Sequence, residues 1–220
     1  MTDAPLEYNP PHPSAAVILL HGLGASGGDL YPLAGALAGG NMRAVCPHAP
    51  ARAVTINGGW KMPAWYDIAG ADLADRQDAK GVRQSAEIIE SLLAAETARR
   101  PSREIFLGGF SQGAALALYA GLRYKKRLAG IIALSGYMLL GETLKAEASA
   151  ANRETPVFQA HGVFDPVVLP AWARQCRDEL QNGGWRAEYH EYPCAHDIPP
   201  QAVADLNLWL KSIIPPQKES

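Results

Sequence analysis

A serine flanked by glycines is the feature of this chain with the clearest chemical meaning. Residues 109–113 read Gly-Phe-Ser-Gln-Gly and follow an apolar run at 104–107. The G-x-S-x-G pattern after a strand is typical of a sharp strand-to-helix turn, where side chains larger than glycine would collide with crowded backbone. Ser111 is therefore the candidate nucleophile. Such pentapeptides also arise by chance in a chain with 21 glycines, so the rest of the sequence must support this interpretation.

Polar residues downstream of Ser111 supply the two partners that a serine nucleophile needs. Asp165 follows an apolar run in the segment His-Gly-Val-Phe-Asp, and His196 follows the last alternating run. A neutral imidazole must take the serine proton, and a carboxylate must orient that imidazole and stabilise its charged form. The chain order Ser, Asp, His is that of α/β hydrolases and differs from the orders in chymotrypsin-like and subtilisin-like enzymes. We predict a triad of Ser111, Asp165 and His196.

Other residues compete for the acid and base roles. The chain has six histidines, and His196 is favoured because it lies in a loop before the terminal helix and completes the chain order. Asp197 adjoins His196, where neighbouring side chains usually diverge too far to make the needed hydrogen bond. Asp165 precedes a proline and is also interpretable as an ordinary turn residue, which leaves Asp67 as the reserve acid.

Two backbone amides are candidates for an oxyanion hole. A tetrahedral intermediate carries negative charge on the former carbonyl oxygen, so N–H groups must already point toward that position. One donor usually comes from the residue after the nucleophile, here Gln112, and the second from the loop after an early strand, where residues 21–24 read His-Gly-Leu-Gly. We predict the amides of Leu23 and Gln112. An ordinary glycine turn is the alternative for residues 21–24.

No cofactor or metal site is predicted from the sequence. Gly22 and Gly24, with glycines at 27 and 28, approximate the dinucleotide-binding fingerprint without matching it, and no acidic residue follows at the ribose-binding spacing. A nicotinamide cofactor is therefore not expected. Cys194 and His196 lack further ligands at zinc spacing, so we expect no metal.

Short apolar runs alternate with helical patterns along the whole chain. A continuous apolar run such as 15–20 is typical of a strand buried on both faces of a parallel sheet, and 78–99 has the apolar spacing of a long helix. This alternation predicts a doubly wound α/β fold with a mostly parallel sheet and a site at the carboxyl ends of its strands. The predicted strands are 15–20, 43–46, 104–110, 128–134, 156–160 and 186–192, and the predicted helices are 30–37, 78–99, 112–123, 170–181 and 201–213.

The length and the absence of a long linker predict one domain over residues 1–220. Residues 1–13 are expected to form an N-terminal tail or an edge strand, and residues 214–220 a C-terminal tail. About twenty residues separate the strand that ends near Ser135 from the next strand, which suits a helix and its turns but not a covering subdomain. We therefore expect no large cap domain and a relatively open site.

Composition excludes several classes of function. The formal net charge is −2 and no long basic block occurs, so nucleic acid is not an expected partner. The first thirteen residues lack the pattern of a secretion signal, and no apolar run approaches the ~18 residues of a membrane span, so stable membrane insertion is not expected. The three cysteines are odd in number and widely spaced, which favours reduced thiols and a cytoplasmic setting.

Four segments of the chain resemble the small carboxylesterase, phospholipase and acyl-protein thioesterase family of α/β hydrolases. They lie at 21–25, 55–67, 109–113 and 161–168. The resemblance implies hydrolysis of short to medium acyl esters or long-chain thioesters by the predicted triad and amides, and it implies a homodimer. Where the family often carries methionine or glycine before the histidine, this chain has Cys194 and Ala195.

The family resemblance also implies an acyl pocket. The segment after an Asn-Gly-Gly turn would line its acyl side near Ser111, with further residues beside the acid loop. Ordinary core packing is the alternative, because large apolar side chains are usually core. The predicted substrate-binding residues are Trp60, Met62, Trp65, Ile68, Val168 and Leu169.

The expected activity is that of a serine carboxylesterase that works through an acyl-enzyme intermediate. Within the same mechanism, an acyl-protein thioesterase or a lysophospholipase is the alternative, because pocket depth and surface shape are not readable from the sequence. From a different class, a non-catalytic binding protein can keep the hydrolase fold as a ligand pocket. An intact triad argues against this last interpretation.

Overall fold

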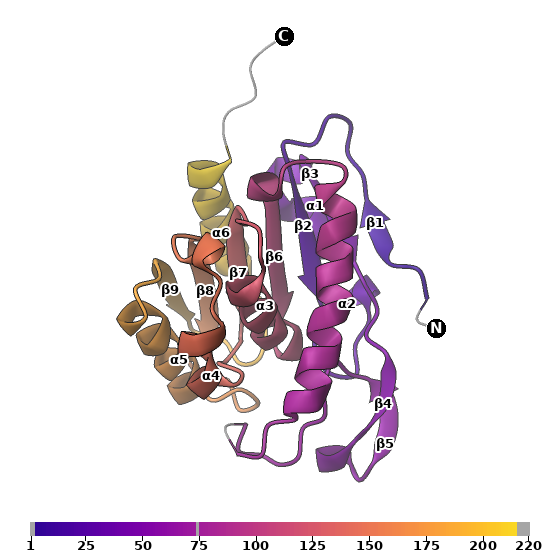
Figure 1. Ribbon diagram of the computed structural model, residues 1–220, viewed down its shortest axis with the longest axis vertical. Coiled ribbons are helices and arrows are strands. Elements are labelled where there is room, and N and C mark those ends of the chain that lie inside the picture. Colours follow the sequence, from indigo (N-terminus) through magenta and orange to yellow (C-terminus); the bar gives the residue numbers. More distant parts are fainter. Residues whose placement is uncertain (1–2, 74, 215–220) are drawn as a thin grey trace.

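A seven-stranded sheet with helices on both faces forms the centre of the protein (Figure 1). The structure is a computed structural model and describes residues 3–73 and 75–214. The strand order is β1-β3-β2-β6-β7-β8-β9, and every neighbouring pair is parallel except β1 with β3. This arrangement confirms the predicted doubly wound, mostly parallel α/β fold in one domain.

The strands form where the sequence has continuous apolar runs. All six residues of the second strand are buried, as expected for a strand covered on both faces. The last strand lies at the edge of the sheet and is the least buried of the parallel strands. The strands of the large sheet are β1 (Leu6–Tyr8), β2 (Ala15–Leu20), β3 (Met42–Cys46), β6 (Ile105–Phe110), β7 (Gly130–Leu134), β8 (Val157–Gly162) and β9 (Ala187–Tyr192).

The helices divide into two layers. Asp78 caps the start of the second helix, because its side chain accepts a hydrogen bond from the Gly81 amide at 2.9 Å, and the fifth and sixth helices each have a proline in the first turn. In Figure 1, α2, α3, α4 and α5 lie in front of the sheet, and α1 and α6 lie behind it. The helices are α1 (Gly27–Ala36), α2 (Ala79–Thr97), α3 (Gln112–Arg123), α4 (Gly141–Glu147), α5 (Pro170–Asn182) and α6 (Pro200–Ile213).

Each face of the sheet has its own hydrophobic core. Alternate residues of one strand point to opposite faces, so Ile18 packs under α2 and α3 while Val17 and Leu19 pack under α1 and α6. The helix α3 is buried along almost its whole length, which fixes the serine at its start against the middle of the sheet.

A hairpin within residues 51–63 differs from the sequence-based prediction, whereas α4 and the edge strand β1 agree with it. β4 (Ala51–Val54) and β5 (Trp60–Pro63) form a separate antiparallel hairpin, and α4 occupies the interval that was expected to hold a helix and its turns. β1 lies within residues 1–13 and pairs with β3 as an edge strand. Of the predicted C-terminal tail, residues 215–220 lie outside the described residues.

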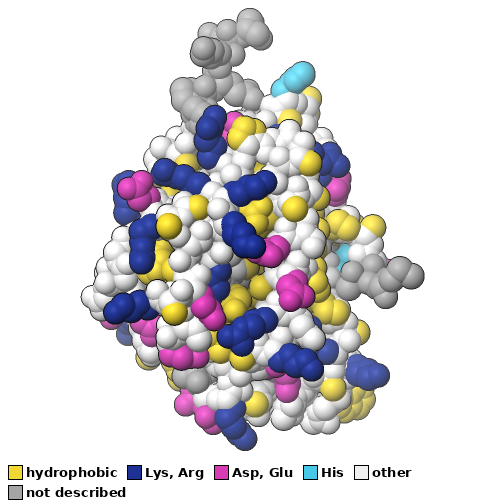
Figure 2. Space-filling model, viewed as in Figure 1, with side chains coloured by type: hydrophobic (Ala, Val, Ile, Leu, Met, Phe, Trp, Pro, Cys, Tyr) yellow, Lys and Arg dark blue, Asp and Glu magenta, His cyan; other side chains and the backbone are white. Residues whose placement is uncertain are grey.

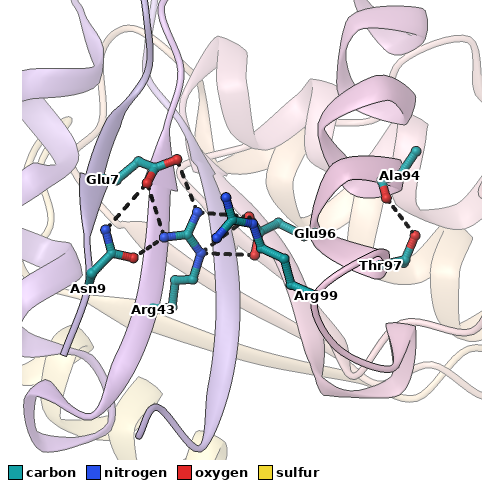
Figure 3. Close-up of polar contacts among 7 residues, drawn as sticks. All are labelled: Glu7, Asn9, Arg43, Ala94, Glu96, Thr97 and Arg99. Atoms are coloured by element: carbon teal, nitrogen blue, oxygen red, sulfur yellow. Dashed lines mark hydrogen bonds and ion pairs between the residues drawn. The ribbon is translucent and has the colours of Figure 1, made fainter. Parts of the chain in front are cut away.

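A buried ion cluster joins the edge strand β1 to the end of α2 (Figure 3). The Arg43 guanidinium donates to both carboxylate oxygens of Glu96 and lies 3.0 Å from a carboxylate oxygen of Glu7. Asn9 accepts another hydrogen bond from Arg43, and Arg99 lies 3.7 Å from Glu96. The Glu96 and Glu7 carboxylates raise the pKa of Arg43, so the guanidinium stays charged inside the fold.

Candidate active site

Ser111 lies on a sharp turn between β6 and α3. It has φ 56° and ψ −120°, a backbone conformation that non-glycine residues rarely adopt and that costs energy wherever it occurs. The Ser111 amide donates to the Leu134 carbonyl at 2.8 Å, and the Ser111 carbonyl accepts from Ala115 at 3.1 Å. The surrounding strand and helix therefore hold the serine at the carboxyl edge of the central sheet, 9% exposed.

The two glycines of the turn are required by close backbone contacts. A Cβ atom on Gly109 would lie 2.5 Å from the Gly113 carbonyl carbon and 2.6 Å from the Leu20 carbonyl oxygen. A Cβ atom on Gly113 would collide with the carbonyls of Leu20 and His21. The structure thus gives the physical reason for the glycine spacing that singled out this pentapeptide in the sequence.

Asp165 and His196 form a hydrogen-bonded pair. His196 Nδ1 lies 2.6 Å from Asp165 Oδ2, and the other carboxylate oxygen accepts from the amides of Val167 and Val168 at 2.8 and 2.9 Å. The Asp165 side chain is fully buried, whereas that of His196 is 18% exposed. Because a carboxylate accepts, Nδ1 carries the proton in this pair and Nε2 is left free to accept one.

The histidine of this pair lies against the serine turn. The His196 ring packs on the ring of Phe110, the residue before Ser111, with centroids 4.7 Å apart. A Cβ atom on Gly162 would lie 2.5 Å from the Cys194 carbonyl oxygen, so the histidine loop rests directly on the end of β8. The structure thereby brings the three residues of the predicted triad to the same edge of the sheet.

His161 is a second histidine beside the acid. It is buried, its Nε2 donates to the Val168 carbonyl at 2.8 Å, and the same nitrogen lies 3.4 Å from Asp165 Oδ2. Burial lowers the pKa of His161, so the ring is neutral at pH 7. With Nε2 engaged, this side chain holds the acid loop and does not compete with His196 as the base.

The loop with the predicted Leu23 amide borders the serine. A Cβ atom on Gly22 would lie 3.4 Å from the Ser111 Cβ, so the backbone of this loop passes directly beside the candidate nucleophile. Gly24 has φ 73° and donates to the Pro63 carbonyl at 2.8 Å, which ties the loop to β5. Gln112 is the first residue of α3, where backbone amides have no intrahelical acceptor. Both predicted amides therefore belong to segments that flank Ser111.

Sequence reasoning missed the role of His21. Its Nε2 accepts from the Ala49 amide at 3.0 Å, which places the proton on Nδ1, and Nδ1 donates to the Gly22 carbonyl at 2.7 Å. Burial lowers the pKa of His21 and keeps the ring neutral at pH 7. The histidine of the His-Gly pair was the available signal in the sequence, although nothing there indicated its partners.

The predicted substrate-binding residues fall into two groups. Trp65 and Val168 lie in the core, with 0% and 2% exposure, and Trp65 donates its indole N–H to the His21 carbonyl at 2.9 Å. Trp60 is 77% exposed at the start of β5, and Leu169 is 45% exposed. Met62 and Ile68 are half-buried. The reserve acid Asp67 instead accepts hydrogen bonds from the amide and hydroxyl of Thr55.

A groove of about 780 Å³, lined by both apolar and charged side chains, opens between α4, α5 and the segment that precedes α2. Ser111 and His196 do not line it within the described part of the chain. Its wall residue Tyr137 is linked to the residue after Ser111, because the Tyr137 hydroxyl lies 2.7 Å from that of Tyr66, which donates to the Gln112 carbonyl at 3.4 Å. Its apolar lining comprises Leu73, Tyr137, Met138, Leu144, Trp172 and Trp185.

The face of the molecule that lies in front of the sheet has a surface of mixed character. Figure 2, which views the same face as Figure 1, shows charges of both signs interspersed, with apolar side chains visible between them.

In residues 3–73 and 75–214, no group of three or more His, Cys, Asp or Glu side chains could hold a metal ion. The same residues contain no helix with the length and apolar character needed to cross a membrane.

A nucleophile turn at the carboxyl edge of a doubly wound sheet, with an Asp–His pair beside it, defines an α/β hydrolase. Comparison with known proteins refines this class. The family model described as phospholipase/carboxylesterase matches residues 7–214. The chain therefore belongs to the phospholipase/carboxylesterase family and is a serine hydrolase.

Relatives and solved structures agree with this family. The chain is similar to acyl-protein thioesterase 1 homolog 1 of Dictyostelium discoideum, with 40% identity over 182 residues that cover 80% of each chain. It is 35% identical over 210 residues to acyl-protein thioesterase 1 of Yarrowia lipolytica, covering 91% of this chain and 92% of the relative. The crystal structure of Zea mays acyl-protein thioesterase 2 is similar with a TM-score of 0.86 and 30% identity, covering 96% of this chain and 99% of the other.

Proposed function

We propose that this chain hydrolyses acyl thioesters and acyl esters through Ser111, His196 and Asp165. The observation that carries the proposal is the 2.6 Å hydrogen bond between His196 Nδ1 and Asp165 Oδ2, with the imidazole packed against the residue beside Ser111. This bond selects the tautomer whose Nε2 can take a proton from the serine. The glycine contacts of the turn support the same assignment.

The reaction follows from these positions in two halves. Ser111 Oγ attacks the acyl carbonyl carbon and transfers its proton to His196 Nε2, while the amides of Leu23 and Gln112 donate to the oxygen that becomes negative. The intermediate collapses, His196 returns the proton to the leaving thiolate or alkoxide, and an acyl-enzyme remains on Ser111. Water then attacks with His196 as the base, which releases the carboxylic acid and restores the serine.

We infer that acyl thioesters carried by proteins are the preferred substrates. Two observations support this: the relatives from Dictyostelium discoideum and Yarrowia lipolytica are named as acyl-protein thioesterases, and the groove near Tyr137 offers apolar surface for an acyl chain. This reverses the order given by the sequence, which placed a simple carboxylesterase first. Short-chain ester and lysophospholipid hydrolysis are the alternatives with the same mechanism.

Ser111→Ala provides the test of the mechanism. We expect the variant to fold, to lose at least about 10³-fold in kcat/KM on p-nitrophenyl butyrate, and to lose labelling by a fluorophosphonate probe. Wild-type activity in a folded Ser111→Ala protein would contradict the nucleophile assignment. A wild-type protein that is folded but neither labels nor turns over substrate would instead support the non-catalytic binding protein.

A chain-length profile separates the substrate alternatives. Initial rates are measured on acyl esters from acetyl to palmitoyl beside a palmitoylated peptide thioester and a lysophospholipid. We expect the highest kcat/KM on the palmitoyl thioester. A maximum at butyryl that falls steeply with longer chains would favour a simple carboxylesterase, and a maximum on the lysophospholipid would favour a lysophospholipase.

We further propose a reducing, cytoplasmic setting and a homodimer. The support for the first is that Cys46, Cys176 and Cys194 are all free thiols, with the first two buried. The homodimer is an implication of the family resemblance. Analytical ultracentrifugation over a range of protein concentrations tests it directly.

A further inference from the structure

Trp65 is fully buried next to the site and makes hydrogen bonds to both segments that flank Ser111. Its exposure is 0%, so it does not offer a surface to substrate, although the sequence suggested that role. Its carbonyl accepts a hydrogen bond from the Ser85 hydroxyl on α2, which anchors it from the side of the helix layer. Both N–H groups of this buried residue, the backbone amide and the indole, donate hydrogen bonds to the flanking segments, which indicates a positioning role.

The first contact runs to the segment of Gln112. The Trp65 amide donates to Gln112 Oε1 at 2.9 Å, and Gln112 Nε2 donates to the Tyr66 carbonyl at 2.8 Å. The glutamine side chain thus pairs with the backbone on either side of the Trp65–Tyr66 peptide bond. Gln112 is 1% exposed, so this pairing is shielded from water and holds the residue whose amide is one proposed oxyanion donor.

The second contact runs to the loop of Leu23. The Trp65 indole N–H donates to the His21 carbonyl at 2.9 Å, and the two rings lie 5.3 Å apart between centroids. His21 Nδ1 in turn donates to the Gly22 carbonyl at 2.7 Å. That carbonyl and the Leu23 N–H belong to the same planar peptide and point in opposite directions, so fixing one fixes the other.

We propose that Trp65 is a positioning residue that holds the two oxyanion-hole amides at a fixed separation around Ser111. One end of Trp65 binds the segment of Gln112, and the other end binds the peptide before the one that carries the Leu23 N–H. The inference rests on the proposed function, because it concerns the two amides assigned there. Trp65 acts through these amides and does not touch the reacting atoms.

Two variants remove the indole N–H while keeping an aromatic side chain. Trp65→Phe deletes the donor with some loss of volume, and 3-benzothienylalanine at position 65 keeps the bicyclic shape with sulfur in place of the N–H. For both we expect kcat on p-nitrophenyl butyrate to fall about tenfold or more with KM nearly unchanged, because transition-state charge loses aligned donors. Affinity for a trifluoromethyl ketone inhibitor, which forms a tetrahedral adduct, should fall by the same factor.

Trp209→Phe is the matched control. Trp209 is also a buried tryptophan, but it packs against Phe106 in the core on the other face of the sheet. We expect this variant to keep kcat even where its thermal midpoint falls. Measuring the thermal midpoint of every variant separates a loss of alignment from a loss of fold.

The outcomes are separable from those of the proposed function. Loss of kcat and of inhibitor affinity in the benzothienylalanine protein, at a wild-type thermal midpoint, would support the positioning role. Unchanged kcat in that folded protein would overturn it, and so would an equal loss of kcat in Trp209→Phe. If the wild-type protein itself fails to label at Ser111, the proposed function fails, which is a different result.

Discussion

Single residues near the site divide into those that face solvent and those that the fold has removed from it. His196 keeps an exposed edge beside Ser111, whereas His21 and His161 are buried and donate from a ring nitrogen to the carbonyls of Gly22 and Val168. The same residue type therefore serves two purposes within one site. The distinction depends on burial and hydrogen-bond partners, which no spacing rule in the sequence reports.

The buried histidines make stability depend on pH. Burial lowers the pKa of His21 and of His161, so below the ordinary histidine pKa of about 6.5 the unfolded chain binds protons that the folded protein does not. The stabilisation is complete above that pH and is lost as the pH falls toward the lowered values. We expect the free energy of unfolding in urea to be smaller at pH 5.5 than at pH 7.5, with a smaller difference in His161→Gln.

Carboxyl groups titrate in a lower pH range and therefore do not obscure the pH dependence expected from the buried histidines. The pKa of Glu147 is lowered to about 2, first by the hydrogen bond from the Thr143 hydroxyl and also by Arg123. Its contribution is complete above its ordinary value and is lost only as the pH falls below about 4.5. A His161→Gln protein with the wild-type difference between pH 5.5 and 7.5 would contradict the assignment to His161.

At the scale of elements, most of the alternation was readable from the sequence. Apolar runs such as that of β2 and the helix after Ser111 were predicted with the bounds that the structure shows, because burial on both faces leaves a continuous signal. The β4–β5 hairpin was missed because its strands are short and largely exposed, so they carry no apolar pattern. The edge strand β1 is also short and largely exposed, and for residues 1–13 the sequence left a tail and an edge strand as alternatives.

The sequence predicted the candidate triad but not the contacts that surround it. Glycine spacing and chain order singled out the three residues that the structure gathers at one sheet edge. The bonds that Trp65 makes to His21 and Gln112 join residues 44 and 47 positions apart, and pairings of this range leave no local pattern. For this reason the sequence suggested pocket-lining roles for large apolar side chains that the structure buries in the core.

The ion cluster of Figure 3 concerns two elements, the edge strand β1 and the end of α2. Glu96→Gln would remove the buried anionic partner of the Arg43 guanidinium and leave the partly exposed carboxylate of Glu7, and we expect a loss of about 3 kcal/mol in the free energy of unfolding. Glu7→Gln removes the partner with a 38% exposed side chain and should cost no more than about 1 kcal/mol.

Urea unfolding of both variants checks this ranking. Equal losses in Glu96→Gln and Glu7→Gln would contradict it. Arg43 pairs in register with Ala16 at the amino ends of the strands, whereas Ser111 follows their carboxyl ends. The specific activity of the folded fraction should therefore equal that of the wild type in each case.

At the scale of the whole molecule, the hairpin and the groove are two candidate places for an acyl chain. The family resemblance pointed to the segment that includes Trp60, which the structure leaves 77% exposed on the hairpin. The groove has a volume of about 780 Å³ and a partly apolar lining, with Trp172 of α5 in its wall. Because each buried methylene contributes about 0.8 kcal/mol, a long chain gains most where apolar contact is continuous.

Substituting Trp172 and Trp60 by alanine, one at a time, decides whether the groove or the hairpin holds the acyl chain. If the groove holds the chain, Trp172→Ala lowers kcat/KM on a palmitoyl thioester about tenfold and leaves p-nitrophenyl acetate hydrolysis unchanged, because only a long chain reaches that wall. Trp60→Ala then has little effect on either substrate. The opposite pattern would assign the acyl chain to the hairpin. A loss on both substrates in Trp172→Ala, at an unchanged thermal midpoint, would show that this side chain affects the chemistry at Ser111 rather than chain length.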